Sequence, residues 1–408
     1  MGALHNLGKE FKKAIILYSR HGFRALVRET AKKMGFKHMG KYLARQDVFR
    51  ELKFVTFPTV APKSNGARTN TINWYIPLVG KGSGGHGNIF RFIRALESFG
   101  VENRIILIGP ELPKSSKVAA EQIMEWFFPI KARVYRWGED IPEAYVGMAT
   151  EWRTAYYLRS SDKEKTRAYF IQDFEPWFFP RGTHYTLAEE TYRFGFKGVT
   201  AGSWLSDLVT KEYGMSAVPI GFPADLETYQ KKEIEKPENV VKVFFYARPP
   251  TPRRDFELGL LALQVLISKR PNVIPVFAGW DLSTYKIPFR HESFGVLDEK
   301  QLPELYGRAD LALVISATNL SLLPVDLMAC EVPIVSNRGP NVEWLLNEGN
   351  SYLCDLTVES ISDSLILAID NSLDSKKRAD QAKKDISVLS WDVEAEKAAK
   401  FLGLSTDQ

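Results

Sequence analysis

The fold is decided by one stretch of the chain, Pro324-Val325-Asp326-Leu327-Met328-Ala329-Cys330-Glu331-Val332-Pro333-Ile334-Val335. Proline suits the first turn of a helix, and Asp326 places a carboxylate in that same turn. Residues 332–335 are apolar, which is typical of a strand that is buried in a parallel sheet. A carboxylate at a helix start just outside such a sheet is well placed to hold a sugar hydroxyl.

Length and composition narrow the class of protein. A chain of 408 residues favours two domains, and 45% hydrophobic with 25% charged residues excludes disordered and fibrous proteins. The two cysteines, Cys330 and Cys354, lie in apolar runs, which predicts buried free thiols in a reducing compartment. We find neither an apolar run long enough to span a bilayer nor a signal-peptide segment, so we expect a cytoplasmic protein.

The positive charge is concentrated in residues 1–46, which hold 11 Lys or Arg and two Glu, whereas the whole chain has a net charge of +5. Apolar residues at helical spacing predict two basic amphipathic helices in this arm. Its apolar faces have two open roles: docking on the protein itself or on a second copy as a homodimer, or peripheral contact with the inner face of the plasma membrane. The arm has no nucleic-acid motif, so nucleic acid is not an expected partner.

Strand and helix signals alternate along the chain in two series, which are separated by the polar stretch 231–239. Such alternation predicts parallel sheets with helices on both faces. We therefore predict an α/β fold with two facing Rossmann-like domains. Its parts are a basic helical arm (1–46), an N-terminal acceptor-side domain (47–222), a C-terminal donor domain (223–375) and C-terminal helices that pack back on the N-terminal domain (376–408).

The predicted elements follow the hydrophobic pattern and the turn residues. In the first series we expect strands at 71–77, 104–108, 133–136, 167–171, 198–201 and 217–220, and helices at 88–99, 116–127, 152–160, 186–194 and 203–213. In the second we expect strands at 242–246, 274–278, 293–294, 311–315 and 332–335, and helices at 256–269, 299–309, 342–346 and 360–372. Residues 47–70 read as a connector.

Ligands of open parallel sheets bind at the carboxyl ends of the strands, so two facing sheets form a cleft. The first segment at such an end is 80–88, which contains five glycines, including Gly84 and Gly85, and also His86. Glycines let backbone N–H groups approach an anion closely. The alternative for this segment is a flexible loop without a ligand.

Three further segments follow predicted strands. Arg248, Arg253 and Arg254 lie in a proline-rich loop, and guanidinium groups bind phosphate bidentately; the alternative is a solvated basic loop. Asp173 and Glu175 combine with the aromatic residues of 172–179 into a surface for a sugar ring, or into an acidic pair for a metal. In residues 318–326, the Asp326 carboxylate could bind ribose hydroxyls, and the backbone amides near Leu322 could bind a diphosphate. The alternative is that Asp326 is a carboxylate at a helix start and binds no ligand.

Several runs of residues resemble one known family. They are Gly84-Gly85-His86, residues 169–176 with 190–196, and residues 245–258. Together with the opening stretch, they resemble WsaF-type rhamnosyltransferases of surface-polysaccharide synthesis, a branch of family 4 of the GT-B glycosyltransferases, over about residues 70–400. The resemblance implies a GT-B fold, no metal, retention of anomeric configuration and a dTDP-rhamnose donor, with UDP- and GDP-sugars as alternatives. The implied acceptor is a growing surface glycan, free or lipid-linked.

The chain departs from the motif that GT-B glycosyltransferases usually carry, Glu-x7-Glu running into Ala-Met-Ala-Cys-Gly-x-Pro-Val-Val. Asp326 stands for the second glutamate, Glu331 for the glycine, and Thr318 for the first glutamate. Loss of the first glutamate removes a contact to the donor sugar, which favours a deoxysugar such as rhamnose. It also leaves open a catalytically inactive subunit that binds nucleotide sugars or glycans.

The resemblance also implies roles for individual residues. Arg248 would bind the diphosphate and act in catalysis, with Asp173 and Glu175 as further catalytic candidates. The other donor-site candidates are Gly84, Gly85, His86, Arg253 and Lys300 near the phosphates, Val296 near the base, Leu322 by its backbone, and Asp326 at the ribose. Positive charge and amides would stabilise the departing diphosphate, whose oxygen takes the acceptor proton, so no protein nucleophile is needed.

Overall fold

The computed structural model describes residues 48–62 and 66–406. The chain forms two units, residues 1–57 and 58–408. The described part of the first unit holds the short helix α3 (Val48–Glu51) and the 3-10 helix η1 (Lys53–Thr56), so residues 47–70 are not a plain connector. The helices predicted within 1–46 lie outside the described residues.

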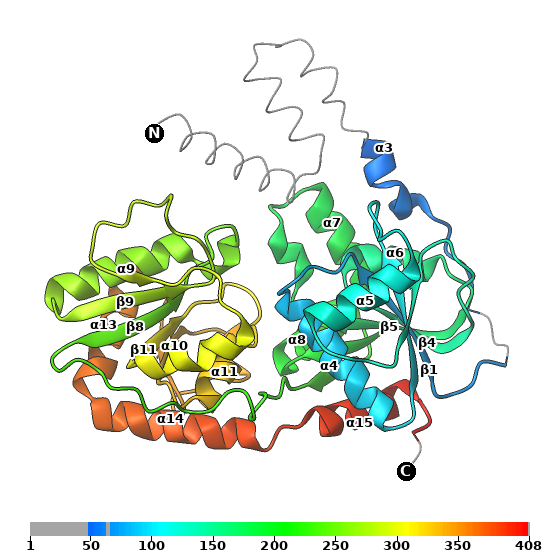
Figure 1. Ribbon diagram of the computed structural model, residues 1–408. Coiled ribbons are helices and arrows are strands. Elements are labelled where there is room, and N and C mark those ends of the chain that lie inside the picture. Colours follow the sequence, from blue (N-terminus) through cyan, green and yellow to red (C-terminus); the bar gives the residue numbers. More distant parts are fainter. Residues whose placement is uncertain (1–47, 63–65, 407–408) are drawn as a thin grey trace, which may run out of the picture. The chain divides into compact units, whose positions relative to one another are not determined.

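The first sheet of the second unit, of which Figure 1 labels β1, β4 and β5, has seven strands. Their order is β3-β2-β1-β4-β5-β6-β7, and every neighbouring pair is parallel. Its strands are β1 (Thr71–Pro77), β2 (Glu102–Ile108), β3 (Arg133–Arg136), β4 (Ala144–Ala149), β5 (Glu164–Ile171), β6 (Lys197–Ala201) and β7 (Ala217–Ile220). The helices between them are α4 (Gly84–Ser98), α5 (Ser116–Trp126), α6 (Trp152–Arg159), η2 (Glu175–Phe178), α7 (Thr183–Glu190), η3 (Thr191–Arg193) and α8 (Ser203–Tyr213).

Strand β4 was not predicted, although it lies between β1 and β5 in the middle of the sheet. Glycine weakens a strand pattern, and Gly147 stands inside β4. The glycine is required here, because a Cβ at this position would lie 2.4 Å from Leu158 Cδ1 and 2.6 Å from Glu164 Cγ. The close approach of neighbouring side chains therefore requires a glycine in β4, and this glycine interrupts the apolar pattern by which a strand is recognised in a sequence.

The second sheet has six parallel strands in the order β10-β9-β8-β11-β12-β13. They are β8 (Val241–Tyr246), β9 (Val273–Ala278), β10 (Glu292–Ser293), β11 (Leu311–Val314), β12 (Ile334–Asn337) and β13 (Tyr352–Cys354). The helices are η4 (Pro252–Arg254), α9 (Phe256–Lys269), η5 (Glu299–Gln301), α10 (Leu302–Arg308), α11 (Leu323–Ala329), α12 (Pro340–Glu343) and α13 (Val358–Asp370). Strand β12 begins two residues later than predicted, and the short β13 was missed.

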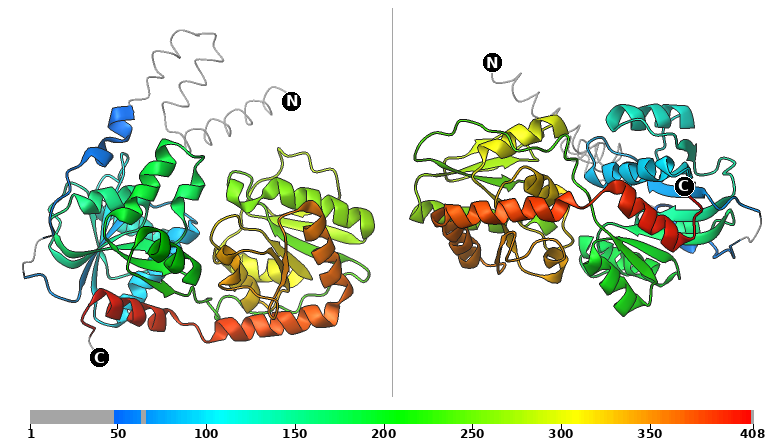
Figure 2. Two further views of the ribbon diagram at one scale, coloured as in Figure 1. Left: turned by 180° about the vertical axis from the view of Figure 1, so that it is seen from behind. Right: turned by 90° about the horizontal axis from the view of Figure 1, so that it is seen from below.

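Two helices follow the second sheet, α14 (Ser372–Ser387) and α15 (Trp391–Leu402), drawn in orange and red in Figure 2. Helix α14 contacts α11, and Tyr352 Oη donates a 2.8 Å hydrogen bond to the α14 carboxylate of Asp374. Helix α15 contacts α4 and β7, and Lys197 Nζ donates to the carbonyl oxygen of Phe401 at 3.0 Å. The predicted return of the chain to the first sheet is confirmed, as are the two parallel sheets.

Buried apolar residues form one core around the first sheet and two clusters at the second sheet. Cys330 and Cys354 are both buried and free, as predicted. Among the helices of residues 48–62 and 66–406, none combines the length and the apolar character needed to span a membrane. The domain boundaries at 222/223 and 375/376 stay predictions.

Candidate active site

Asp173 connects the loops at the carboxyl ends of the two sheets. It lies two residues after β5, where its Oδ2 accepts a 2.8 Å hydrogen bond from Thr318 Oγ1 and its Oδ1 a 2.9 Å bond from the amide of Asn319. Burial raises the pKa of this carboxyl, while the guanidinium of Arg254 and the Asn319 amide act in the opposite direction. The third and fourth predicted segments therefore meet, and they meet at the position of the missing glutamate.

Asn319 adds a second set of bonds between the sheets. Its Nδ2 donates to the carbonyl oxygens of Gln172 at 3.0 Å and Ala201 at 2.9 Å, and its Oδ1 accepts from Trp344 Nε1 at 2.9 Å. Trp344 also lies against Gly202, where an added Cβ would come within 2.5 Å of the indole ring. Sequence reasoning missed Asn319 and Trp344, because neither stands in a local pattern that signals a contact.

Glu175 has a different placement from the one predicted for a catalytic group. Its Oε1 accepts from Tyr169 Oη at 2.9 Å and its Oε2 from the amide of Trp152 at 2.7 Å, both within the first sheet and its helices. Burial, with a smaller effect of the nearby Glu151 carboxylate, raises the pKa of Glu175 to about 8. Both oxygens are engaged and the residue is 5% exposed, an environment that favours a structural role, and the catalytic role of Glu175 stays a prediction.

The arginine loop follows β8 and contains η4. Arg248 is exposed and donates to Tyr246 Oη at 2.9 Å. Arg253 stands with its Cζ 4.2 Å from the centre of the Phe178 ring and its Nε 3.6 Å from Asp173 Oδ2. Arg254 donates to Ser316 Oγ, and burial lowers its pKa to about 10, so it stays charged at neutral pH. Three guanidinium groups thus gather at one strand end, which suits a diphosphate.

The glycine-rich segment is more ordered than predicted. Helix α4 begins at Gly84, so Gly84, Gly85 and His86 form its first turn rather than a loop before residue 88. Ser83 Oγ lies 2.8 Å from His86 Nδ1, and burial lowers the His86 pKa to about 4, which keeps the ring neutral at pH 7. Gln172 Nε2 donates to the Gly85 carbonyl at 3.1 Å, which ties this turn to the segment of Asp173.

Asp326 lies in the first turn of α11, as predicted, and is half-buried. Burial raises its pKa well above the usual range; Arg91 opposes this shift, Glu299 adds to it, and Tyr229 hydrogen-bonds to the carboxyl. Arg91 comes from α4 and pairs with Glu299 at 3.3 Å. The pattern of the sequence gave no sign of Arg91 or Tyr229, because each is far from Asp326 along the chain.

The end of α11 explains one departure from the family motif. Glu331, at the glycine position, has a φ of 56°, in the left-handed region that favours glycine. Its carboxylate pairs with Lys383 Nζ at 2.6 Å and Lys231 Nζ at 3.2 Å. The backbone shape of the motif is therefore kept although the glycine is not.

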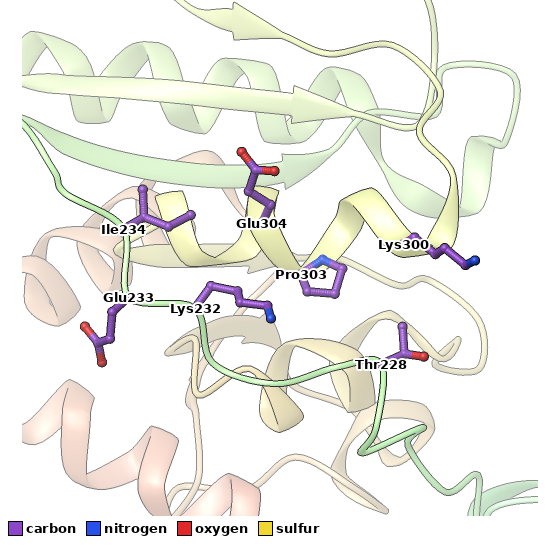
Figure 3. A pocket seen from close by; sticks show the side chains of 7 residues that line it. All are labelled: Thr228, Lys232, Glu233, Ile234, Lys300, Pro303 and Glu304. Carbon is purple, nitrogen blue, oxygen red and sulfur yellow. The ribbon is translucent and has the colours of Figure 1, made fainter.

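The remaining predicted donor residues are spread over the second sheet. Lys300 lines a cavity of about 630 Å³ together with residues on α10 and on the extended segment 228–234 (Figure 3). The other lining residues are Thr228, Lys232, Glu233, Ile234, Pro303 and Glu304. Val296 is 76% exposed, and the side chain of Leu322 packs against the core of the first sheet. In the part of the chain that the structure describes, no group of three or more His, Cys, Asp or Glu side chains is arranged to hold a metal.

Two protein-family models match the chain, one over most of the first sheet and one over most of the second sheet. The model of the WsaF N-terminal domain matches residues 80–201, and that of the WsaF C-terminal domain matches residues 241–366. The two matches follow one another in the order of the two sheets, and together they include more than half of the chain.

A curated relative is the O-antigen biosynthesis protein RfbC of Myxococcus xanthus. It is 30% identical over an alignment of 345 positions that covers 82% of this chain. The chain spans only 27% of the length of that relative.

Solved structures of glycosyltransferases share the fold. Sucrose-phosphate synthase of Thermosynechococcus elongatus superposes with a TM-score of 0.61 at 10% identity, over 81% of this chain and 98% of the other. HepE of Anabaena, in complex with UDP and glucose, superposes with a TM-score of 0.62 at 12% identity, over 81% and 98%. At these identities the likeness shows the fold alone, which is the predicted GT-B fold.

Proposed function

Because the chain belongs to the WsaF family and has the GT-B fold, we propose that it is a glycosyltransferase of surface-polysaccharide synthesis. It transfers a hexose from a nucleoside-diphosphate sugar to a growing surface glycan. The names of its relatives support this class of reaction, since RfbC is described as an O-antigen biosynthesis protein and HepE is in complex with UDP and glucose.

One observation carries the proposal: the arginine loop after β8 gathers Arg248, Arg253 and Arg254 at the same sheet end as Asp326. A nucleoside-diphosphate sugar has two groups that match. Its diphosphate suits guanidinium groups, and its ribose hydroxyls suit a carboxylate. Arg248 is exposed and holds only Tyr246 among the described residues, so it is free to turn toward an oxyanion.

In the proposed reaction the bond between the anomeric carbon and the diphosphate oxygen breaks while a bond to the acceptor oxygen forms on the same face. Negative charge develops on the diphosphate as its bond to the anomeric carbon breaks, and the acceptor proton passes to the departing diphosphate oxygen. Arg248 and Arg253 stabilise that charge, which lowers the barrier. Asp326 holds the ribose and takes no part in bond changes.

We propose dTDP-rhamnose as the donor. Thr318 stands where the motif has a glutamate, and its hydroxyl is directed to Asp173. The site therefore offers no carboxylate from this position of the second sheet to a sugar hydroxyl. This suits a donor sugar that lacks a hydroxyl, such as rhamnose. UDP- and GDP-sugars are the alternatives that the experiment includes.

The test is incubation of the protein with dTDP-rhamnose, UDP-glucose or GDP-mannose and a glycan fraction from the source cell surface, with release of nucleoside diphosphate as the readout. We expect release from one donor, and at least a hundredfold slower release with Arg248→Ala. Binding of a nucleotide without any release would instead identify a catalytically inactive binding subunit. Unchanged turnover of Arg248→Ala would remove this residue from the site.

A further inference from the structure

Arg253 is held by residues of the other sheet. Its guanidinium lies between Phe178, at 4.2 Å from the ring centre, and Asp173, at 3.6 Å from Nε to Oδ2. Both partners come from the segment that follows β5, whereas Arg253 itself follows β8. An arginine of the second sheet is thus oriented by an anion and a ring of the first.

The carboxylate of Asp173 has little freedom to move. It accepts hydrogen bonds from the amides of Phe174 at 2.8 Å and Asn319 at 2.9 Å, and from Thr318 Oγ1 at 2.8 Å. Its side chain is 11% exposed. A carboxylate fixed in this way can also fix the guanidinium beside it, because an ion pair with one rigid partner removes side-chain freedom.

The far edge of the guanidinium is not used by the protein. Within residues 48–62 and 66–406, the two Nη atoms of Arg253 have no hydrogen-bond partner, while the side chain is 31% exposed. Arg248 and Arg254 lie close to Arg253, and the carboxylates near these three guanidinium groups are Asp173, beside Arg253 and Arg254, and Asp255, beside Arg254. The excess positive charge and the open Nη edge together call for an anion.

We infer that Asp173, with Phe178, is a positioning residue that aims Arg253 at the outer phosphate of a nucleoside diphosphate. The inference rests on the proposed function and deepens it. It replaces the catalytic role that the sequence suggested for Asp173, since Asp173 acts through Arg253 and not on the substrate. It also makes phosphate binding by the second sheet depend on a residue of the first.

The opposite role is a carboxylate that competes with phosphate for Arg253. The geometry argues against it, because Asp173 faces Nε and leaves the bidentate Nη edge open. The two roles predict opposite signs for the same substitution. Removal of a competitor tightens nucleotide binding, whereas removal of a positioning group weakens it.

The test is Asp173→Asn, which keeps the size of the side chain and removes its charge. Calorimetric titrations of the full chain measure Kd for dTDP and for dTMP, which lacks the outer phosphate; UDP with UMP and GDP with GMP replace them if the wild type binds those more tightly. We expect the ratio of the two affinities to fall about tenfold in Asp173→Asn. A structural role alone would weaken both ligands equally.

Two comparisons complete the design. Glu175→Gln changes a neighbouring buried carboxyl whose two oxygens accept hydrogen bonds from the first sheet and its helices, and it is expected to leave the ratio unchanged. In an Arg253→Ala background, Asp173→Asn should change the ratio no further. Equal loss for both ligands, or tighter dTDP binding, overturns the inference while wild-type binding upholds the proposed function. Absence of nucleoside-diphosphate binding by the wild type rejects both.

Discussion

The hydroxyl of Thr318 donates a 2.8 Å hydrogen bond to the carboxylate of Asp173, a residue 145 positions earlier in the chain. Thr318 takes the place of a motif glutamate, and a glutamate there would bring a second negative charge to Asp173. The exchange of glutamate for threonine thus fits a contact between the two sheets. The site is built from both sheets even before a ligand binds.

Thr318→Val tests the energetic weight of this contact. It leaves a buried carboxylate without one of its donors, so we expect the free energy of unfolding to fall by about 1–3 kcal/mol. Urea denaturation followed by fluorescence measures the change. Thr318→Ser keeps the hydroxyl and should lose less than the valine variant; equal losses would assign the effect to packing of the methyl group.

Gly202→Ala tests the approach of Trp344 to the first sheet. Gly202 has a φ of 83°, and a Cβ would lie 2.5 Å from the indole. Gly214→Ala is the control for a positive φ in open space, since Gly214 has a φ of 66° and no atom within 4 Å of an added Cβ. Its ψ is 17° against 165° at Gly202, so part of the larger loss at Gly202 comes from the backbone. We expect about 1–2 kcal/mol of destabilisation from backbone strain at Gly214 and a clearly larger loss at Gly202. Similar losses in thermal or urea unfolding would show that Trp344 moves aside freely.

Stability is expected to depend on pH through Glu175. Its pKa is about 8 in the folded chain against 4.5 for an ordinary glutamate, so the folded state retains a proton that the unfolded state has lost. This contribution to stability is present below pH 4.5 and is lost as the pH rises to about 8. Relative to Glu175→Gln, the wild type should therefore unfold at progressively lower urea between pH 5 and pH 8. Parallel curves for the two proteins would show that Glu175 does not titrate in this window.

Asp326→Ala tests the ribose contact. A hydrogen bond contributes about 0.5–1.5 kcal/mol between neutral groups and about 1.5–3 kcal/mol to a charged group, so the affinity for the preferred nucleoside diphosphate should fall roughly two- to hundredfold. Asp363→Asn is the control, since it removes an acidic side chain from a helix beside the second sheet. Asp363 lies on α13 and pairs with Lys269 Nζ of α9 at 2.9 Å. We expect calorimetry to find wild-type affinity there. A wild-type affinity of Asp326→Ala would leave this carboxylate with a helix-start role only.

The fold was predictable because most strands carry continuous apolar runs. Strand β1, Thr71–Pro77, is buried, with polar residues before it and the glycine-rich segment 80–88 after it in the sequence. Its predicted bounds match the structure. Strand β4 contains Gly147, which is needed because the side chains of Leu158 and Glu164 lie too close for a Cβ. The sequence does not show this requirement, because it depends on residues that are neighbours only in the folded chain. The start of α4 was placed four residues late, because the propensity of glycine argues against a helix while the Ser83 cap argues for one.

The site was predictable as a set of loops and not as a set of contacts. Strand ends meet in any open parallel sheet, so the segments of Arg248, Asp173 and Asp326 could be selected from their order alone. The hydrogen bonds that Asn319 donates reach Gln172 and Ala201, more than a hundred positions earlier in the chain. The approach of Trp344 to the first sheet requires a glycine at position 202. Likewise, nothing local distinguishes Glu175, whose environment favours a structural role, from Asp173 two residues before it.

Helix α15 has a consequence for the order in which the protein is made. Its residues Ala395, Ala398 and Leu402 belong to the core of the first sheet, whose strands end at Ile220. A chain that leaves the ribosome from its N-terminus can pair β1 to β7 early, yet it cannot close that core until residue 402 has emerged. The first sheet must therefore wait, partly uncovered, through the synthesis of the second, and its folding is completed only after most of the chain exists.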